Sequence, residues 1–438
     1  MNGSDRPKTV YIPYMCDHAY VLGAALRAHD IPAEVLPPPD DRSLAIGLDL
    51  CGGRECLPCF TSTGDIIRRA EEPGFDPARA VLLVPTTAGP CRFGQYNVLQ
   101  REILDRHGLA EVEMISPSAA NSYQGFGDRP AELRALFWQG IVAVDLLQKL
   151  LHEHRPYEIE PGHADETYRR CLDRIVAAIE RGGGKETVQA MRWTARRFEA
   201  LGVDRTEPRP LIGLVGEIYI RFNTYSNQNI IRQVEAAGGE VVVASLMEWF
   251  YFTNWRVKAL TGVVGTPLDF LKISLVDLYQ RRQERRLSEP VEHLLRHPHE
   301  SPIAQLMDNI RPYYEPALGT EAVLSMGKAI DFARNGLCGI LNIMPFSCMP
   351  GIIVAGMAPR LRPDLYNIPW LDVIYDAQGA TNINTRLEAF MYQATQFQRR
   401  LAKQAPCYVE RSSPVRAPGG SGDSVSPAPC APQATRWR

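Results

Sequence analysis

The sequence predicts an α/β protein with two parallel-sheet units of the Rossmann or flavodoxin type, joined by a helical connector and followed by a disordered C-terminal tail. Short apolar runs alternate with amphipathic stretches in residues 8–118, and the same alternation returns in residues 210–401. The stretch between them is helical in pattern and rich in charge. The expected parts are an N-terminal α/β unit over residues 1–125, a connector over 126–208, a C-terminal α/β unit over 209–408 and a tail over 409–438.

The first unit is expected to contain four strands and the helices between them. Strands are expected at residues 8–15, 33–36, 80–85 and 112–115, and helices at residues 19–29 and 96–106. This alternation is typical of a parallel sheet, because neighbouring parallel strands need a crossover connection that is usually a helix.

The connector and the second unit follow from the same patterns. Apolar residues such as Leu133, Leu136, Ile141, Val144 and Leu147 have the spacing of one buried helix face. The second unit opens with the run LIGLVGEIYI, and its alternation is interrupted by a helical stretch that we interpret as an insertion. Its expected elements are helices at 227–237, 260–296, 321–334 and 385–401 and strands at 240–244, 338–344 and 373–375. The tail is rich in Ser, Pro and Gly and cannot bury enough apolar area to fold.

Composition excludes several classes of protein. The formal net charge of the 438 residues is −2, which provides no field that would attract nucleic acid or an anionic membrane. No signal-peptide core and no long apolar run is present in the sequence, so we expect a cytoplasmic protein that does not cross a membrane. In that reducing compartment the ten cysteines indicate metal binding or chemistry more than disulfide bonds.

Five cysteines have the spacing of a metal site. Cys51, Cys56 and Cys59 form a C-x4-C-x2-C pattern in CGGRECLPCF, which matches the first three ligands of plant-type [2Fe-2S] proteins. Cys91, in GPCRFGQY, and Cys348, in PFSCMPG, each follow an expected strand at a turn into a helix. Open parallel sheets bind their ligands at this carboxyl edge. Thiolates are strong donors for iron, so the set predicts an iron-sulfur cluster.

Other interpretations of the cysteines remain open. A free cysteine is often simply a small buried apolar residue, which is our preferred interpretation of Cys16, Cys171 and Cys338. Cys51 and Cys59 fit that interpretation and the role of ligand equally well. Zinc is an alternative metal for four thiolates, but the paired C-x2-C motifs of zinc sites are missing from the sequence.

Four charged residues are candidates for catalysis. Glu55 and Arg92 flank proposed ligands and could orient a thiolate, accept a proton or contact an anionic substrate. A surface or loop-capping role fits both equally well. Glu217 and Arg221 follow the first strand of the second unit, where a carboxylate could act as a base and a guanidinium could hold a phosphate or carboxylate. A simple ion pair at the strand end would also explain them.

Histidine and nucleotide sites are not indicated. The closest histidine pairs are His152 with His154 and His297 with His299, both in polar segments that we expect to be solvated. The fragment RGGGKET lacks the Ser or Thr that follows the lysine in a phosphate-binding loop. The sequence therefore predicts no ATP site in this chain.

The motifs GRECLPCFTSTGD, GPCRFGQY, LVGEIYIRFN, PFSCMPG and DAQGATNINTRLEAF occur in this order along the chain. Together they resemble the activase-related branch of the 2-hydroxyacyl-CoA dehydratase superfamily, over roughly residues 8–403. The resemblance implies a [4Fe-4S] cluster held by Cys56, Cys91 and Cys348, with one iron open to substrate. Such a cluster can polarise a thioester carbonyl and supply one electron.

The resemblance also implies partners and an activity. The electron would come from a separate ATP-hydrolysing activator with an actin-like fold, and a second dehydratase-like subunit would complete a lyase or an ATP-dependent reductase acting on an acyl-CoA. Two alternatives stay open, namely a double-cubane cluster protein that reduces small molecules and a non-catalytic scaffold that docks the activator.

Overall fold

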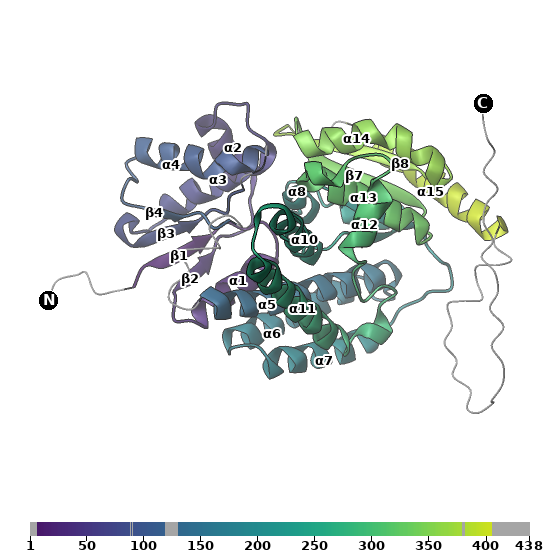
Figure 1. Cartoon of the computed structure of the whole chain (residues 1–438), viewed down its shortest axis with the longest axis horizontal. Coiled ribbons are helices and arrows are strands. Elements are labelled where there is room, and N and C mark those ends of the chain that lie inside the picture. The colour runs from purple at the N-terminus through teal and green to yellow at the C-terminus, as the bar shows by residue number, and fades with distance from the viewer. Residues whose placement is uncertain (1–6, 88, 90, 119–129, 379–381, 405–438) are drawn as a thin grey trace. The chain divides into compact units, whose positions relative to one another are not determined.

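The computed structural model describes residues 7–87, 89, 91–118, 130–378 and 382–404 (Figure 1). The chain divides into two units, Met1–Gln398 and Arg399–Arg438, and the first contains two four-stranded parallel sheets. The predicted α/β class with two parallel sheets is therefore confirmed. The expected tail at 409–438 lies outside the described residues, so it stays a prediction, as do the boundaries of the four expected parts.

The first sheet has the strand order β2-β1-β3-β4, and all its strand pairs are parallel. Val10 of β1 pairs with Ala33 of β2 and with Val81 of β3, so β1 and β3 are the central strands. The strands are β1 (Thr9–Ile12), β2 (Ala33–Val35), β3 (Ala80–Leu83) and β4 (Glu113–Ile115). The helices are α1 (His18–Arg27), α2 (Asp41–Leu50), α3 (Leu57–Ala70), η1 (Pro77–Arg79), η2 (Arg92–Gln95) and α4 (Tyr96–Arg106).

The expected connector is helical. It consists of α5 (Pro130–His154), η3 (Arg155–Tyr157), α6 (His163–Glu180) and α7 (Lys185–Glu199). Helix α5 contacts α1, α6 and α7, and its residues Leu146, Leu147 and Leu150 are fully buried. None of the helices in the described part of the chain has the length and apolar character that a membrane crossing needs.

The second sheet repeats the order of the first as β6-β5-β7-β8, again with parallel pairs only. The strands are β5 (Leu211–Gly216), β6 (Glu240–Val243), β7 (Gly339–Pro345) and β8 (Trp370–Tyr375). The first helices are α8 (Ile218–Phe222), α9 (Ile230–Ala236), α10 (Met247–Val264), α11 (Pro267–Ser288) and η4 (Glu292–Leu294). The later ones are α12 (Ile303–Ile310), η5 (Pro316–Leu318), α13 (Thr320–Arg334), α14 (Met349–Leu361), η6 (Arg362–Leu365) and α15 (Ile383–Gln404).

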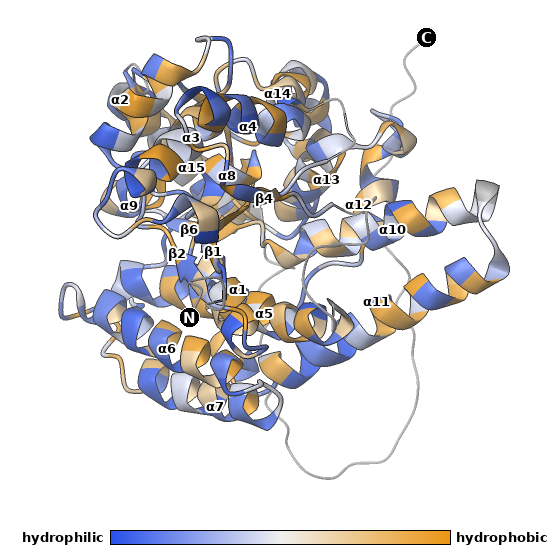
Figure 2. Ribbon diagram, turned by 90° about the vertical axis from the view of Figure 1, so that its left-hand side faces the viewer, coloured by the Kyte–Doolittle hydropathy of each residue, from blue (hydrophilic) through white to orange (hydrophobic). Residues whose placement is uncertain are grey.

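The helical insertion forms the hairpin of α10 and α11, which extends away from the second sheet (Figure 2). It begins at residue 247, well before the expected 260, because the aromatic-rich segment after β6 continues as helix. Thr266 ends the turn by accepting a hydrogen bond from the Asp269 amide, while the Asp269 side chain accepts one from the Thr266 amide. This reciprocal capping fixes the start of α11.

The segment around Cys51 and Cys59 contains two helices, where the sequence analysis expected none. Cys51 ends α2, and Cys59 lies inside α3. The two helices pack very closely, since a Cβ at Gly47 would lie 1.9 Å from the Phe60 carbonyl oxygen. The glycines thus serve helix packing as well as turns. Pro58 sits in the first turn of α3, where proline is common.

Residues far apart in the sequence share one core beside the second sheet. Leu57 of α3 packs in a cluster that includes Leu214 of β5 and Ile220 of α8. The hydroxyls of Thr61 and Tyr219 lie 2.9 Å apart. These contacts place the start of α3, and therefore Cys56, beside α8.

Candidate functional site

Cys56, Cys91 and Cys348 occupy equivalent local positions. Each is the residue immediately before a helix, namely α3, η2 and α14, and each has extended backbone and no side-chain capping hydrogen bond. The first amides of a helix lack partners within it, and the helix dipole makes this end positive. All three thiols are therefore placed where negative charge is favourable.

The charges of these three thiols interact. Burial raises the pKa of Cys56 to about 11, and the charges of Glu217 and Cys91 add to this rise. Burial and the charge of Glu217 likewise raise the pKa of Cys91 and of Cys348, and Cys91 contributes to the shift of Cys348. One carboxylate is thus close enough to act on all three predicted ligands.

Arg92 connects the segments that carry the three cysteines. It follows Cys91 directly, and its Nη1 donates to the Arg54 carbonyl at 2.8 Å and to the Ser347 hydroxyl at 2.7 Å. Arg54 precedes Cys56 by two residues and Ser347 precedes Cys348 by one. The guanidinium therefore holds the three segments together, a role that the sequence did not predict.

Glu217 and Glu321 form a pair of carboxyls next to the thiols. Glu217 accepts hydrogen bonds from the amides of Tyr219 at 3.1 Å and Ile220 at 2.8 Å, yet burial raises its pKa. Burial and the charge of Glu217 raise the pKa of Glu321 well above its ordinary value. Two neighbouring carboxyls do not readily ionise together, so the pair retains a proton.

Glu321 was not among the site residues predicted from the sequence. It lies in the first turn of α13, the helix that precedes β7. In a parallel unit, a helix that leads into a strand begins at the carboxyl edge of the sheet, where the site lies. An acidic residue in the first turn of such a helix could therefore have been predicted to lie at the site.

The remaining charged candidates have structural contacts. Arg221 is buried, donates from Nη1 to the Gly216 carbonyl at 3.2 Å and lies over the Phe222 ring. Its Nε has no hydrogen-bond partner in the part of the chain that the structure describes. Glu55 accepts a hydrogen bond from the Arg54 amide at 3.0 Å, which corresponds to the loop-capping alternative.

Tyr96 is a further residue at the site that was not predicted. Its hydroxyl lies 2.5 Å from the Cys56 Sγ, and burial raises the pKa of this phenol well above the usual value. The phenol therefore keeps its proton and can donate to the sulfur. Sequence alone gives no indication of this contact, because Tyr96 is forty positions further along the chain.

Cys51 and Cys59 form a separate pair. Their side chains are hydrogen bonded to each other, which lowers the pKa of Cys51 and raises that of Cys59. Both lie in the apolar core of the first sheet, and Cys59 is completely buried. Cys338 is also buried and precedes β7, whereas Cys348 follows that strand at its other end.

The described residues contain no ready-made site for a single metal ion. Within these ranges, no three His, Cys, Asp or Glu side chains meet closely enough to hold one. In an iron-sulfur cluster each thiolate binds a different iron atom, so the ligands surround the cluster instead of meeting at one point. A cluster at the three segments that Arg92 joins would have to be held in this way.

A hydrogen-bonded series of Cys16, His18 and Asp145 was not predicted. The Cys16 Sγ lies 3.2 Å from His18 Nδ1, and His18 Nε2 lies 3.1 Å from Asp145 Oδ1. Asp145 also accepts hydrogen bonds from the amides of Leu246 and Met247. The thiol, imidazole and carboxylate are arranged as in nucleophilic enzymes, but each residue is at most 2% exposed, so a substrate cannot reach the sulfur. We interpret the series as a connection between α1, α5 and α10.

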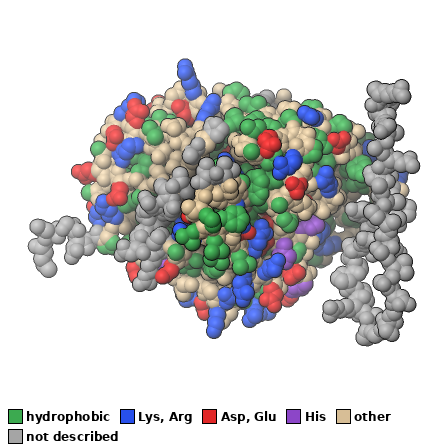
Figure 3. Space-filling model, in the orientation of Figure 1, with side chains coloured by type: hydrophobic (Ala, Val, Ile, Leu, Met, Phe, Trp, Pro, Cys, Tyr) green, Lys and Arg blue, Asp and Glu red, His purple; other side chains and the backbone are tan. Residues whose placement is uncertain are grey.

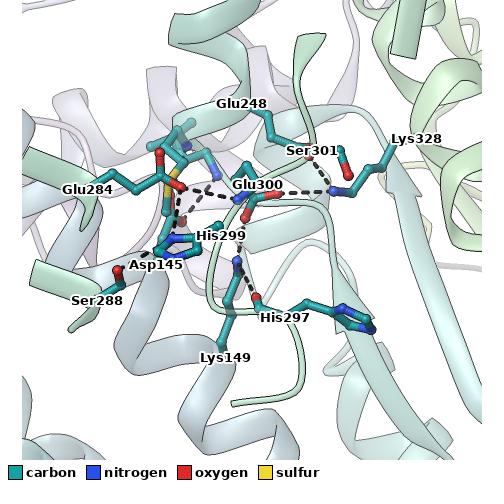
Figure 4. Close-up of polar contacts among 12 residues, drawn as sticks. Asp145, Lys149, Glu248, Glu284, Ser288, His297, His299, Glu300, Ser301 and Lys328 are labelled. Carbon is teal, nitrogen blue, oxygen red and sulfur yellow. Dashed lines mark hydrogen bonds and ion pairs between the residues drawn. The ribbon is translucent and has the colours of Figure 1, made fainter. Parts of the chain in front are cut away.

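A second polar cluster surrounds Lys328 (Figure 4). Its Nζ pairs with Glu248, with Glu300 at 3.0 Å and with Asp331 at 3.8 Å. Lys149 pairs with the other oxygen of Glu300 at 2.5 Å. Burial, together with the charge of Glu300, raises the pKa of Glu248 to about 8 against the opposing charge of Lys328. The cluster borders a cavity of about 70 Å³ lined by charged and apolar groups of α5, β6 and α13.

The expectation of solvated histidines is wrong for one pair. His152 and His154 are buried on the last turns of α5, and burial lowers the pKa of both. Residues two apart on a helix point to different sides, so the end of α5 is covered on more than one side, a feature that the polar sequence around the histidines did not indicate. His297 and His299 are exposed, as expected.

Neither protein-family models nor curated proteins give a match to this sequence. Membership of the dehydratase superfamily therefore stays a prediction based on the motifs. The contacts of Arg92 with the three cysteine segments do not depend on these comparisons.

Proposed function

We propose that this chain is the iron-sulfur subunit of a 2-hydroxyacyl-CoA dehydratase-like system. Cys56, Cys91 and Cys348 would hold a [4Fe-4S] cluster that accepts low-potential electrons from an ATP-dependent activator. The observation that supports this most is that Arg92, next to Cys91, donates hydrogen bonds to residues beside Cys56 and Cys348, so one side chain joins the three segments that carry the thiols.

Two buried polar atoms near the thiols suit a bound group. Among the described residues Glu321 Oε1 and Arg221 Nε have no hydrogen-bond partner, which is costly unless a ligand or water satisfies them. When bound, such a cluster supplies one-electron transfer and an iron site open to an oxygen atom of the substrate.

The chain's own groups would manage charge and protons. The carboxyl pair of Glu217 and Glu321 holds a proton beside the thiols, as a general acid must. Arg221 places a buried positive charge at the same strand end, where it can attract an anionic group of the substrate. Arg92 holds the three segments that carry the cysteines next to one another. These groups favour chemistry at the site over a purely scaffolding role.

The substrate and partners rest on the motifs alone. By that resemblance the substrate is an acyl-CoA, the electron donor is an activator with an actin-like fold, and a second dehydratase-like subunit and a cytoplasmic location are expected. A double-cubane protein that reduces small molecules would use the same thiols.

Anaerobic purification with iron and sulfide counting tests the proposal. We expect about four iron atoms and as much acid-labile sulfide per chain, with an electron paramagnetic resonance signal after reduction. Cys56→Ser and Cys91→Ser should each lower the iron content severalfold, while Cys171→Ser, a buried cysteine on α6, should leave it unchanged. Twice the iron per chain would favour the double-cubane alternative. Iron-free protein after anaerobic reconstitution would contradict the proposal.

A further inference from the structure

The hairpin of α10 and α11 has its polar groups inside. Three polar side-chain pairs join the two helices, all at hydrogen-bond distance. They are Tyr251 with Glu284 at 2.5 Å, Asn254 with Gln280 at 2.5 Å and Lys258 with Asp277 at 3.1 Å. Positions three and four apart share one face of a helix, so these pairs define the facing sides of the hairpin.

The outer side of α11 is apolar. Leu268, Leu271, Leu275 and Leu278 are 58%, 54%, 56% and 64% exposed. Their spacing of three, four and three residues forms one stripe along the helix. With 3.6 residues per turn, this stripe lies opposite the positions that face α10. A helical hairpin that is surrounded by water buries its leucines between the two helices and exposes its polar groups. The hairpin of α10 and α11 does the opposite.

The stripe belongs to a larger apolar patch. Space-filling side chains show a group of hydrophobic residues over α10 and α11 (Figure 3). Leu260, Phe270, Val276 and Tyr279 are also between 37% and 57% exposed. Together with the stripe they make eight large apolar side chains on one hairpin that are each at least 37% exposed, and a gathering of this kind marks an interaction surface.

We propose that this surface docks on the same hairpin of a second copy of the chain, with the two α11 helices antiparallel. The spacing of the four leucines reads the same in both directions. About a twofold axis, Leu268 would lie opposite Leu278 of the second copy, and Leu271 opposite Leu275. A surface that is complementary to itself in this way is what a twofold interface requires.

Charges beside the stripe favour this occupant over a charged partner. Lys272 is paired with Asp269 of the same helix at 3.6 Å, and Asp277 is paired with Lys258 and Arg281. These groups are therefore already neutralised within the hairpin. In the antiparallel register Lys272 would lie level with Ser274 of the second copy and Asp269 level with Asp277, and both carboxylates are already paired with cations of their own hairpin. The interface does not depend on the cysteine site, and its test is independent of iron.

Sedimentation of the full-length chain at micromolar concentration tests the inference. We expect a dimer for the wild type, and a monomer for Leu271→Glu with an unchanged circular dichroism spectrum. Val98→Glu, at an equally exposed position on α4, should remain dimeric. A monomeric wild type, or a Leu271→Glu protein that stays dimeric, would overturn the inference.

A charge exchange tests the register even if a single variant folds poorly. Leu271→Glu and Leu275→Lys should each be monomeric alone, and an equimolar mixture should form a heterodimer with at least tenfold higher affinity than either homodimer. The mixture of Leu271→Glu with Leu278→Lys places the charges out of register and should stay monomeric. Equal association in both mixtures would rule out the antiparallel arrangement.

Discussion

The two parallel sheets have the same strand order but place different chemistry at their carboxyl edges. The third strand of each is followed by a cysteine, Cys91 after β3 and Cys348 after β7. The first strands differ, because β1 leads to the closed series of Cys16 and His18, whereas β5 leads to Glu217 beside the thiols. The repeated fold therefore places a cysteine at matching positions in both halves, while the residue after the first strand differs between them.

The halves also differ in how they bury charge. The second sheet is bordered by the ionic cluster of Lys328, Glu248 and Glu300, while the first half has the close packing of α2 on α3 at Gly47. This difference predicts that the two halves fail for different reasons when they are mutated.

Lys328→Met should have the largest effect. It leaves Glu300 with less compensation in a buried site, so we expect a loss of about 3–5 kcal/mol in the free energy of unfolding. Urea denaturation measures this loss. The control Lys272→Met removes an exposed pair and should change stability by about 0.5 kcal/mol or less. A similar small effect at Lys328 would show that the cluster is not electrostatically important.

Gly47→Ala tests the packing of the first half. The added methyl group would meet the Phe60 carbonyl, so α2 and α3 must separate, at a cost of about 1–3 kcal/mol. Gly356→Ala in α14 points into open space and should instead stabilise its helix by about 0.5–1 kcal/mol. Thermal unfolding of both variants distinguishes these outcomes, and equal shifts would contradict the account of α2 and α3.

His18→Gln tests the buried hydrogen-bonded series of Cys16, His18 and Asp145. Burial lowers the pKa of His18, but the charges of Cys16 and Asp145 overcome this and raise it to about 10. A raised pKa means that the stabilisation is complete below the ordinary value near 6.5 and is lost as the pH rises through about 10. The variant should therefore be less stable by roughly 2 kcal/mol at pH 6, with a difference that shrinks by pH 10. A difference that grows with pH would contradict this assignment.

Tyr96→Phe should have the smallest effect. It removes one hydrogen bond to Cys56, so we expect a loss of about 1 kcal/mol in stability. The rate at which the Cys56 thiol reacts with iodoacetamide under anaerobic conditions should also change. The rate at Cys348, for which the described residues show no such phenol contact, should stay the same. Unchanged reactivity at Cys56 would show that the contact does not influence the sulfur.

Much of the fold could be predicted because local patterns determine it. Apolar runs of four to seven residues marked the buried strands, and helix α4 has the expected bounds. The helices α2 and α3 were not predicted, because this segment is rich in glycine, proline and cysteine, although Gly47 and Gly64 lie inside the helices and serve their close packing. The paired positions of Cys91 and Cys348 were predictable from the topology of parallel sheets.

The rest of the site depends on tertiary contacts. The sequence around Cys56 does not predict the contact with Tyr96. Glu321 lies beside Glu217 only because α13 begins at the sheet edge. The Lys328 cluster joins residues separated by up to 180 positions, of types that are normally exposed. Such groups become informative only when burial is known.

The central claim is that both sheets contribute thiolates to one cluster, and β7 offers the most direct test because it carries a cysteine at each end. Iron and sulfide should be counted in anaerobically reconstituted Cys348→Ser and Cys338→Ser. The account predicts severalfold less iron in Cys348→Ser and a wild-type content in Cys338→Ser. Equal iron in the two proteins would contradict the claim that the second sheet supplies a ligand.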